Sequence, residues 1–169
     1  NPQRVREVIR AINPDILVLE EISARWMADL VWMTNDYPYS VTQPREDNFG
    51  IGLYAKAPIA ESEIAYIGDT EVPSILGTIR TDAAAVRVIA THPLPPAGRE
   101  YSRSRNDQLR GLADIARAER PVLLIGDLNI TPWNHHYRQL LRRSGLRDSA
   151  QGYGVQPTWP NFCVLLRIP

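Results

Sequence analysis

Residues 121–133, PVLLIGDLNITPW, join an apolar run to a polar loop and a helix-start signal. The apolar run followed by Gly126 predicts a buried strand, and the glycine would let another backbone or a ligand approach closely. Asp127 and Asn129 follow two positions apart, so their side chains point the same way if the strand continues. A carboxylate at the end of a buried strand needs a cation, hydrogen-bond donors or solvent. A functional site and an ordinary Asx-turn are both open interpretations of this loop.

The composition indicates one globular domain over residues 1–169. The 169 residues are 44% hydrophobic and 22% charged, which is enough apolar material for a real core. The net charge is zero, so a broad basic surface for nucleic acid is not favoured, although nucleic acid stays an open partner. Cys163 is the only cysteine, which excludes a disulfide within the chain. No apolar run approaches the about 20 residues of a membrane-spanning helix.

Helices are predicted on both sides of the opening stretch. Thr131 is a suitable N-cap and Pro132 a suitable first residue for a helix through Arg143, which Gly145 would end. Residues 103–118 carry apolar side chains at helical spacing on one face. Near the start of the chain, the spacing of apolar residues predicts an amphipathic helix over residues 3–13; its apolar positions are Val5, Val8, Ile9 and Ile12.

The rest of the chain consists largely of predicted strands. A second amphipathic helix, capped by Ser23, carries Trp26, Leu30 and Met33 on one side. The predicted strands cover residues 15–21, 39–44, 49–56, 62–68, 74–81, 84–92, 121–126 and 162–168. Helices and strands at each end surround a central block of strands, which predicts two sheets packed face to face with helices outside. The fold class is therefore α/β or α+β.

Other polar residues lie at strand ends. Glu20 and Glu21 end one predicted strand and His92 ends another. Each of these features is common where a strand meets solvent, so none of them indicates a site by itself. His135 and His136 lie in the first turns of an arginine-rich helix, and we expect them to be surface residues.

The order of these pieces resembles the endonuclease/exonuclease/phosphatase family, which includes DNase I. The pieces are PDILVLEE, NFGIGLYAK, THPLPP, RSRNDQLRGLADI, PVLLIGDLN and PTW, and they run from about residue 3 to the C-terminus. The resemblance implies a four-layer sandwich of two mixed β-sheets flanked by helices. It also implies hydrolysis of phosphate esters with a divalent cation, Mg²⁺ or Mn²⁺.

The resemblance implies roles for individual residues. Glu21 matches the family's metal-ligand glutamate, and Glu20 stands where the family usually has a hydrogen-bonding glutamine. Asp127 matches an aspartate at the metal and the reacting groups, and Asn129 matches an asparagine that orients the phosphate. His92 matches a histidine that contacts the scissile phosphate. Residues 20 and 21 cannot both point into one site while the strand stays regular, and the family register selects Glu21 as the ligand.

Two departures from the family pattern lead to further expectations. The family's first strand would precede residue 1, and its C-terminal Asp-His pair and catalytic histidine would follow residue 169. We therefore expect the given sequence to be truncated at both ends and, assayed alone, to hydrolyse little. We also expect a monomer, in which any contact with a membrane comes from segments outside this sequence; the cellular compartment stays open.

Two functions from different classes fit these residues. The first is a metal-dependent phosphoesterase in its full-length form, a nuclease or a lipid or small-molecule phosphodiesterase. The second is a non-catalytic module of the same fold that binds phosphate-bearing ligands. The presence of Glu21, His92, Asp127 and Asn129 favours the enzyme, whereas nothing in the sequence selects a substrate.

Overall fold

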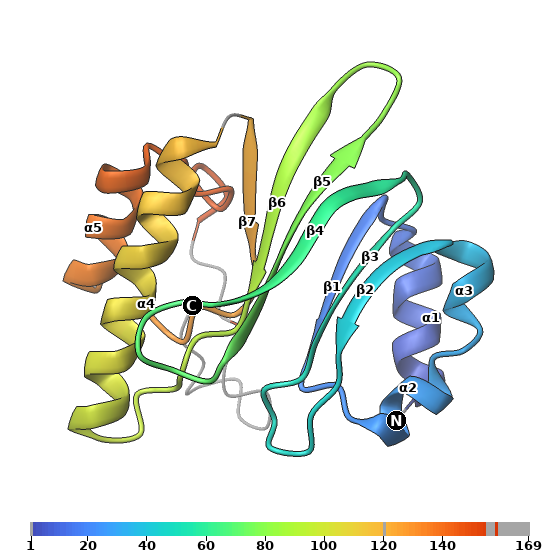
Figure 1. Cartoon of the computed structure of the whole chain (residues 1–169), viewed down its shortest axis with the longest axis horizontal. Coiled ribbons are helices and arrows are strands. Elements are labelled where there is room, and N and C mark those ends of the chain that lie inside the picture. The colour runs from blue at the N-terminus through green and yellow to red at the C-terminus, as the bar shows by residue number, and fades with distance from the viewer. Residues whose placement is uncertain (1, 120, 155–157, 159–169) are drawn as a thin grey trace.

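Four layers lie side by side in the computed structural model, which describes residues 2–119, 121–154 and 158 (Figure 1). From one side to the other they are a helical layer, a four-stranded sheet, a three-stranded sheet and a second helical layer. The structure thus confirms the predicted sandwich of two packed sheets flanked by helices.

The three-stranded sheet contains β1 (Ile16–Glu20), β2 (Tyr39–Gln43) and β3 (Ile51–Ala55) in the order β1-β3-β2. Both pairings are antiparallel. The strands described in this sheet are therefore all antiparallel, and the mixed pairing lies in the other sheet. A short connection suffices to join antiparallel neighbours, and the loop of residues 44–50 joins β2 to β3.

The four-stranded sheet is mixed and has the order β4-β5-β6-β7. Its strands are β4 (Ile59–Tyr66), β5 (Pro73–Arg80), β6 (Ala85–Thr91) and β7 (Val122–Ile125). β6 and β7 pair in parallel, which requires a long crossover. Helix α4 (Arg99–Ala118) supplies that crossover and packs on the outer face of the sheet beside α5 (His135–Ser144).

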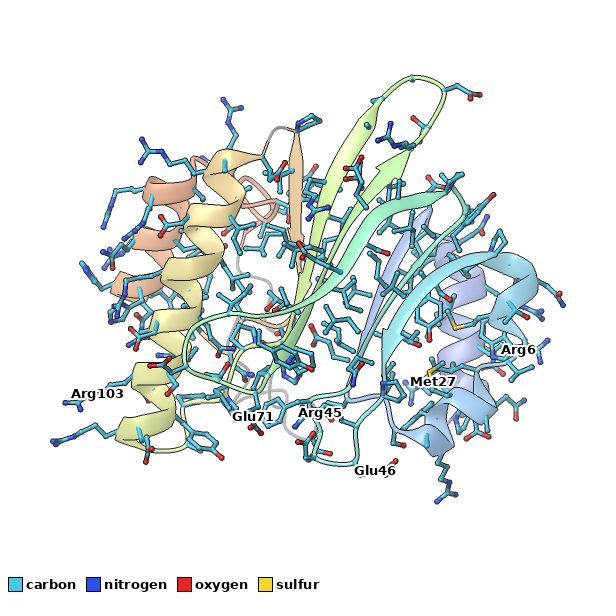
Figure 2. The ribbon with its side chains drawn as sticks, viewed as in Figure 1. Arg6, Met27, Arg45, Glu46, Glu71 and Arg103 are labelled. Atoms are coloured by element: carbon cyan, nitrogen blue, oxygen red, sulfur yellow. The ribbon has the colours of Figure 1, made fainter. Side chains whose placement is uncertain are left out.

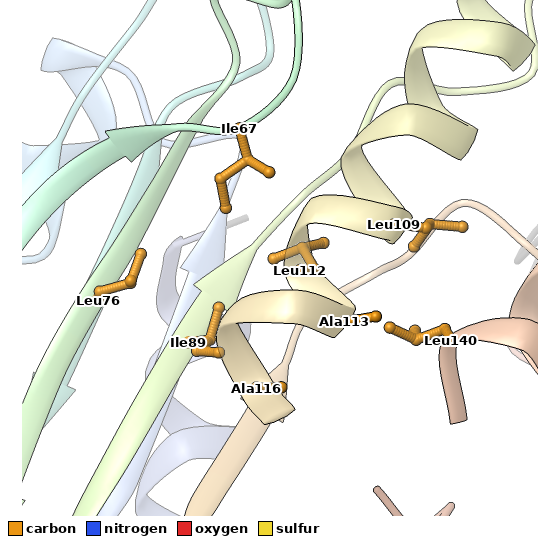
Figure 3. Close-up of a cluster of buried hydrophobic side chains, with 8 residues drawn as sticks. All are labelled: Ile67, Leu76, Ile89, Leu109, Leu112, Ala113, Ala116 and Leu140. Carbon is orange, nitrogen blue, oxygen red and sulfur yellow. The ribbon is translucent and has the colours of Figure 1, made fainter. Parts of the chain in front are cut away.

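Each interface between layers has its own apolar cluster. Figure 3 shows the cluster between α4, α5 and the four-stranded sheet, where Leu112 and Ile89 are fully buried. A second cluster, which includes Leu53 and Val88, lies between the sheets. The third lies under α1 (Pro2–Ile12), α2 (Ala24–Asp29) and α3 (Met33–Asp36). Burying each large apolar side chain stabilises the fold by about 1.5–3 kcal/mol.

The helix predicted after Ser23 is two short helices. Ser23 caps α2 as predicted, because its hydroxyl accepts a hydrogen bond from Trp26 N at 3.4 Å. The helix ends at Asp29, and Met33 begins α3. In α1, Ile9 is buried, but Val8 and Ile12 are 49% and 69% exposed, so only part of the predicted apolar face packs on the sheet.

The start of α5 differs from the prediction. Asn134, not Thr131, is the N-cap, and its side chain accepts a hydrogen bond from His136 N at 2.9 Å. Residues 131–134 form a turn, closed by a hydrogen bond from Asn134 N to Thr131 O, in which Pro132 takes the position that proline favours. Gly145 ends the helix in the left-handed conformation, as predicted.

Two elements begin earlier than predicted. α4 begins at Arg99, four residues before the predicted start at residue 103, and β4 begins at Ile59 rather than at residue 62. The predicted strand over residues 162–168 lies outside the described residues. Within the described part of the chain, no helix is long and apolar enough to cross a membrane.

Candidate active site

The carboxyl ends of three strands meet at one edge of the sandwich. β6 and β7 are parallel neighbours, so the residues that follow them, His92 and Asp127, lie at the same edge of their sheet. Glu20 ends β1 of the other sheet, and its Oε1 accepts a hydrogen bond of 2.8 Å from Asp127 N. One carboxylate therefore joins the two sheets at the place where the sequence predicted a site.

Gly126 makes this close meeting possible. Its φ of +146° lies in a region that side chains rarely adopt. A Cβ at this position would stand 1.9 Å from Thr91 O and 2.6 Å from Glu20 Oε1, both well inside contact distance. The sequence predicted a close approach at this glycine, and the approaching groups are the end of β6 and the Glu20 side chain.

The loop after Gly126 contains an Asx-turn, which was one of the two interpretations that the sequence left open. Asn129 N donates a hydrogen bond of 2.8 Å to Asp127 Oδ1, and the Asp127 side chain is exposed. β7 ends at Ile125, so the strand does not continue, and the condition under which residues 127 and 129 would point the same way is not met. Asn129 has a φ of +51°, and its Nδ2 donates to Pro93 O at 2.9 Å. The two residues thus tie the β7 end to the β6 end.

His92 lies in a nearly closed environment. It is 7% exposed, and the rings of His92 and Phe49 have centroids 6.0 Å apart. Its Nδ1 is buried and has no hydrogen-bond partner among the residues that the structure describes. Just before it, the buried hydroxyls of Thr91 and Ser74 are 2.8 Å apart and hydrogen-bonded. A packed imidazole with a free ring nitrogen is suited to holding or exchanging one proton.

The carboxylates of Glu20, Glu21 and Asp127 interact electrostatically at the edge where the strand ends meet. The pKa of Glu20 is raised to about 7, mainly by burial and to a smaller extent by the charges of Asp127 and Glu21, against the hydrogen bond from Asp127 N, which lowers it. Burial lowers the pKa of His92, whereas the carboxylates of Asp127 and Glu21 act in the opposite direction. Close carboxylates that repel each other favour a bound cation.

Glu20 and Glu21 have different surroundings. β1 ends at Glu20, whose carboxylate is held by Asp127 N. Glu21 is exposed and has a φ of +57°, so the alternation of a regular strand stops before it. The alternation of side chains along a strand therefore does not decide which of the two glutamates points into the site. The assignment of Glu21 as a metal ligand stays a prediction.

The loop of residues 44–50 is a part of the site that sequence reasoning missed. Arg45 N donates to Ile22 O at 3.0 Å, and Ile22 N donates to Gly50 O at 3.2 Å. Figure 2 shows Arg45 beside Glu71, whose carbonyl oxygen accepts from Arg45 Nη1 at 2.9 Å. A Cβ on Gly50 would stand 1.8 Å from Ile22 O. These contacts fix Phe49 against His92, and Gly50 was the signal that could have revealed them.

The two adjacent histidines of α5 differ in their exposure to solvent. His135 is exposed, as predicted, but His136 is half-buried, and burial lowers its pKa. Their rings lie edge to face with centroids 5.4 Å apart. Within residues 2–119, 121–154 and 158, no group of three or more His, Cys, Asp or Glu side chains is arranged to hold a metal ion.

The order of the sequence pieces and this arrangement of strand ends agree with a comparison against known families. The sequence profile described as the Endonuclease/Exonuclease/phosphatase family matches residues 1–166. The chain belongs to this family. No curated protein sequence matches the chain significantly.

Solved structures of the family share the fold. Sphingomyelinase C from Streptomyces griseocarneus has a TM-score of 0.69 and 21% identity, over 87% of this chain and 63% of that protein. A beta toxin variant from Staphylococcus aureus with bound magnesium ions has a TM-score of 0.70 and 17% identity, with the same two coverages of 87% and 63%. An endonuclease/exonuclease/phosphatase from Beutenbergia cavernae has a TM-score of 0.62 and 22% identity, over 79% and 43%. This chain thus spans less than two thirds of the length of these structures.

Proposed function

We propose that the full-length protein hydrolyses phosphate esters with a divalent cation at the site formed by Glu21, His92, Asp127 and Asn129. The observation that carries the proposal is the hydrogen bond from Asp127 N to Glu20 Oε1, 2.8 Å long, which brings the ends of β1 and β7 together beside His92. Membership of a family named for phosphoester chemistry supports the same reaction class.

The carboxylates fit a hard cation such as Mg²⁺ or Mn²⁺. Glu21 and Asp127 are exposed, and both charges act on His92 and Glu20, so they face a common region. Mg²⁺ in proteins is often held by only one or two carboxylates, with waters and substrate phosphate as its other ligands. Two carboxylates are therefore enough. A bound cation would stabilise negative charge on a phosphoryl oxygen.

The other residues supply hydrogen bonds and a proton site. His92 Nδ1 is buried and has no hydrogen-bond partner among the described residues, so the imidazole offers a proton site beside the carboxylates. Asp127 Oδ1 accepts from Asn129 N, which holds the carboxylate in one orientation. Asn129 Nδ2 donates to Pro93 O, and an amide nitrogen carries a second hydrogen that can donate to a phosphate. Fixed donors of this kind stabilise a charge that develops in the transition state.

The test is hydrolysis of bis-p-nitrophenyl phosphate, a diester, and p-nitrophenyl phosphate, a monoester, by the full-length protein with Mg²⁺ or Mn²⁺. We expect chelation by EDTA to abolish hydrolysis. Asp127→Asn should reduce kcat by about 10²-fold or more, because general acid–base groups contribute about 10²–10⁴-fold. Glu21→Gln should weaken Mg²⁺ binding and reduce activity, because it removes a negative charge from the ligands of a hard cation. Glu100→Gln, an exposed carboxylate at the start of α4, is the matched control.

The outcomes separate the two functional classes. If the full-length protein binds Mg²⁺ and inorganic phosphate but hydrolyses neither ester, it is a phosphate-binding module and the enzyme proposal is wrong. Equal loss of activity in Glu100→Gln and Asp127→Asn would also refute the assignment. The 169-residue chain, assayed beside the full-length protein, tests the expectation that it hydrolyses little by itself.

A further inference from the structure

Two polar side chains are buried on the inner face of α4. Arg105 is 6% exposed and Gln108 is 1% exposed. They are three residues apart and so share one face of the helix. Burying a guanidinium is costly unless its donors are satisfied, and Arg105 forms no ion pair with any acidic residue that the structure describes. Its hydrogen bonds must therefore explain its place in the interior.

Arg105 holds the loop that follows β7. Its Nη1 donates to Asn129 O at 2.8 Å, while its Nε and Nη2 donate to Asn106 Oδ1 at 3.3 Å and 3.0 Å. The two bonds to Asn106 fix the plane of the guanidinium and hence its direction toward Asn129. Asn129 has a φ of +51°, in the left-handed region that asparagine tolerates better than most residues with a side chain.

Gln108 holds the loop that follows β6. Its Oε1 accepts from Leu94 N at 3.1 Å, and its Nε2 donates to Thr70 Oγ1 at 3.0 Å. Leu94 is two residues after His92, and Pro93 between them accepts the hydrogen bond from Asn129 Nδ2. The two loops are therefore bonded to each other and, one helical turn apart, to the same helix.

We infer that Arg105 and Gln108 are positioning residues, which set the Asp127–Asn129 loop and the His92–Leu94 loop at a fixed separation. The inference rests on the proposed function, because it assigns these residues to the same site. A helix is a rigid support, and a small displacement of a reacting group can reduce a rate about 10²-fold. Neither residue needs to contact the substrate to have this effect.

The test compares the Arg105→Met and Arg103→Met variants of the full-length protein. Arg103 lies two residues away on α4 and points outward from the helical layer (Figure 2). We expect Arg105→Met to reduce kcat by about 10- to 100-fold with little change in KM, and Arg103→Met to match wild type. Arg105→Lys keeps the charge and one donor group but not the planar fork, so its kcat should fall between the two.

Amide hydrogen exchange gives a readout that does not depend on activity. In Arg105→Met the amide of Asn129 should exchange at least about tenfold faster, while amides of β5 and β6 keep wild-type protection, because the loop opens locally. In Gln108→Met the Leu94 amide, which loses its acceptor, should do the same. Loss of protection throughout the sheet would instead show a role in general stability and overturn the inference.

The outcomes also separate this inference from the proposed function. If wild type hydrolyses no phosphate ester, the proposed function is wrong, and the exchange rates still decide whether α4 holds the loops. If wild type is active and Arg105→Met retains its kcat and its Asn129 protection, the inference is wrong. Should Arg105→Met not fold, Asn106→Ala, which removes the second anchor of the guanidinium, decides the question by the same two measurements.

Discussion

Glu20→Gln should change the way in which stability depends on pH. Glu20 is half-buried beside Asp127 and Glu21, and its pKa is raised from 4.5 to about 7, with burial as the largest cause. A glutamine at this position keeps the carbonyl oxygen that accepts from Asp127 N but cannot ionise. The substitution therefore removes the titration and keeps the hydrogen bond between the sheets.

The direction and magnitude of this pH-dependent change in stability follow from the linkage between proton binding and folding. A carboxyl whose pKa is raised in the folded state binds its proton more tightly there, so its contribution is complete below pH 4.5 and is lost as pH rises to about 7. The interval of 7 − 4.5 = 2.5 pH units, at about 1.36 kcal/mol per unit, corresponds to about 3 kcal/mol. That is a large share of the about 5–15 kcal/mol that stabilises a typical domain.

Urea unfolding measured between pH 4.5 and 8 in EDTA provides the assay. We expect wild type to lose about 3 kcal/mol more than Glu20→Gln across this range, and Glu100→Gln to behave like wild type. Added Mg²⁺ should flatten the wild-type curve, because a nearby cation favours the ionised carboxylate. An unchanged pH dependence in Glu20→Gln would refute the argument, since the titrating group would then be another residue.

Four further substitutions test the packing and the helix start. Gly126→Ala should destabilise the fold and abolish any Mg²⁺ binding, because the added Cβ would stand 1.9 Å from Thr91 O; a crystal structure of the variant with unmoved strand ends would contradict this. Leu112→Ala should lower the free energy of unfolding by about 2–5 kcal/mol in urea titrations, because Leu112 is fully buried; a loss under about 1 kcal/mol would mean that the cluster in Figure 3 is loosely packed. Asn134→Ala should lower the free energy of unfolding by about 1 kcal/mol, and Thr131→Ala should lower it less. Calorimetry can measure both changes, and the reverse order would mean that Thr131 is the cap.

Local sequence signals predicted the layers well and some boundaries poorly. The start of α5 was misplaced because Thr131 and Asn134 are both good caps, and Pro132 suits either a first helical turn or the turn that it occupies. The helix over residues 3–13 was predicted correctly, yet Val8 and Ile12 are exposed. Spacing gives the side of a helix that is apolar, but only the neighbouring layer determines how much of that side is covered.

The site was predictable at its strand ends and not in its supports. An apolar run that stops at Gly-Asp is visible in one segment, so Asp127 could be named as a candidate, and the order of the motifs then favoured a site over an ordinary Asx-turn. The partner of its amide, Glu20, is 107 positions away, and no local pattern connects the two. The same is true of Arg45 and Arg105, which appear in the sequence as ordinary arginines. Their roles depend on which backbone carbonyl lies opposite them in the folded chain.

The hydrogen bond between Asp127 and Glu20 also bears on the order of folding. It closes a loop of 107 residues, and contacts between distant residues form late because their closure entropy must be overcome first. Neither sheet can complete this meeting of strand ends without the other, because the contact joins the end of β1 to the end of β7. During refolding, binding of a divalent cation should therefore appear only after both sheets have docked, so the site reports that the whole sandwich has assembled.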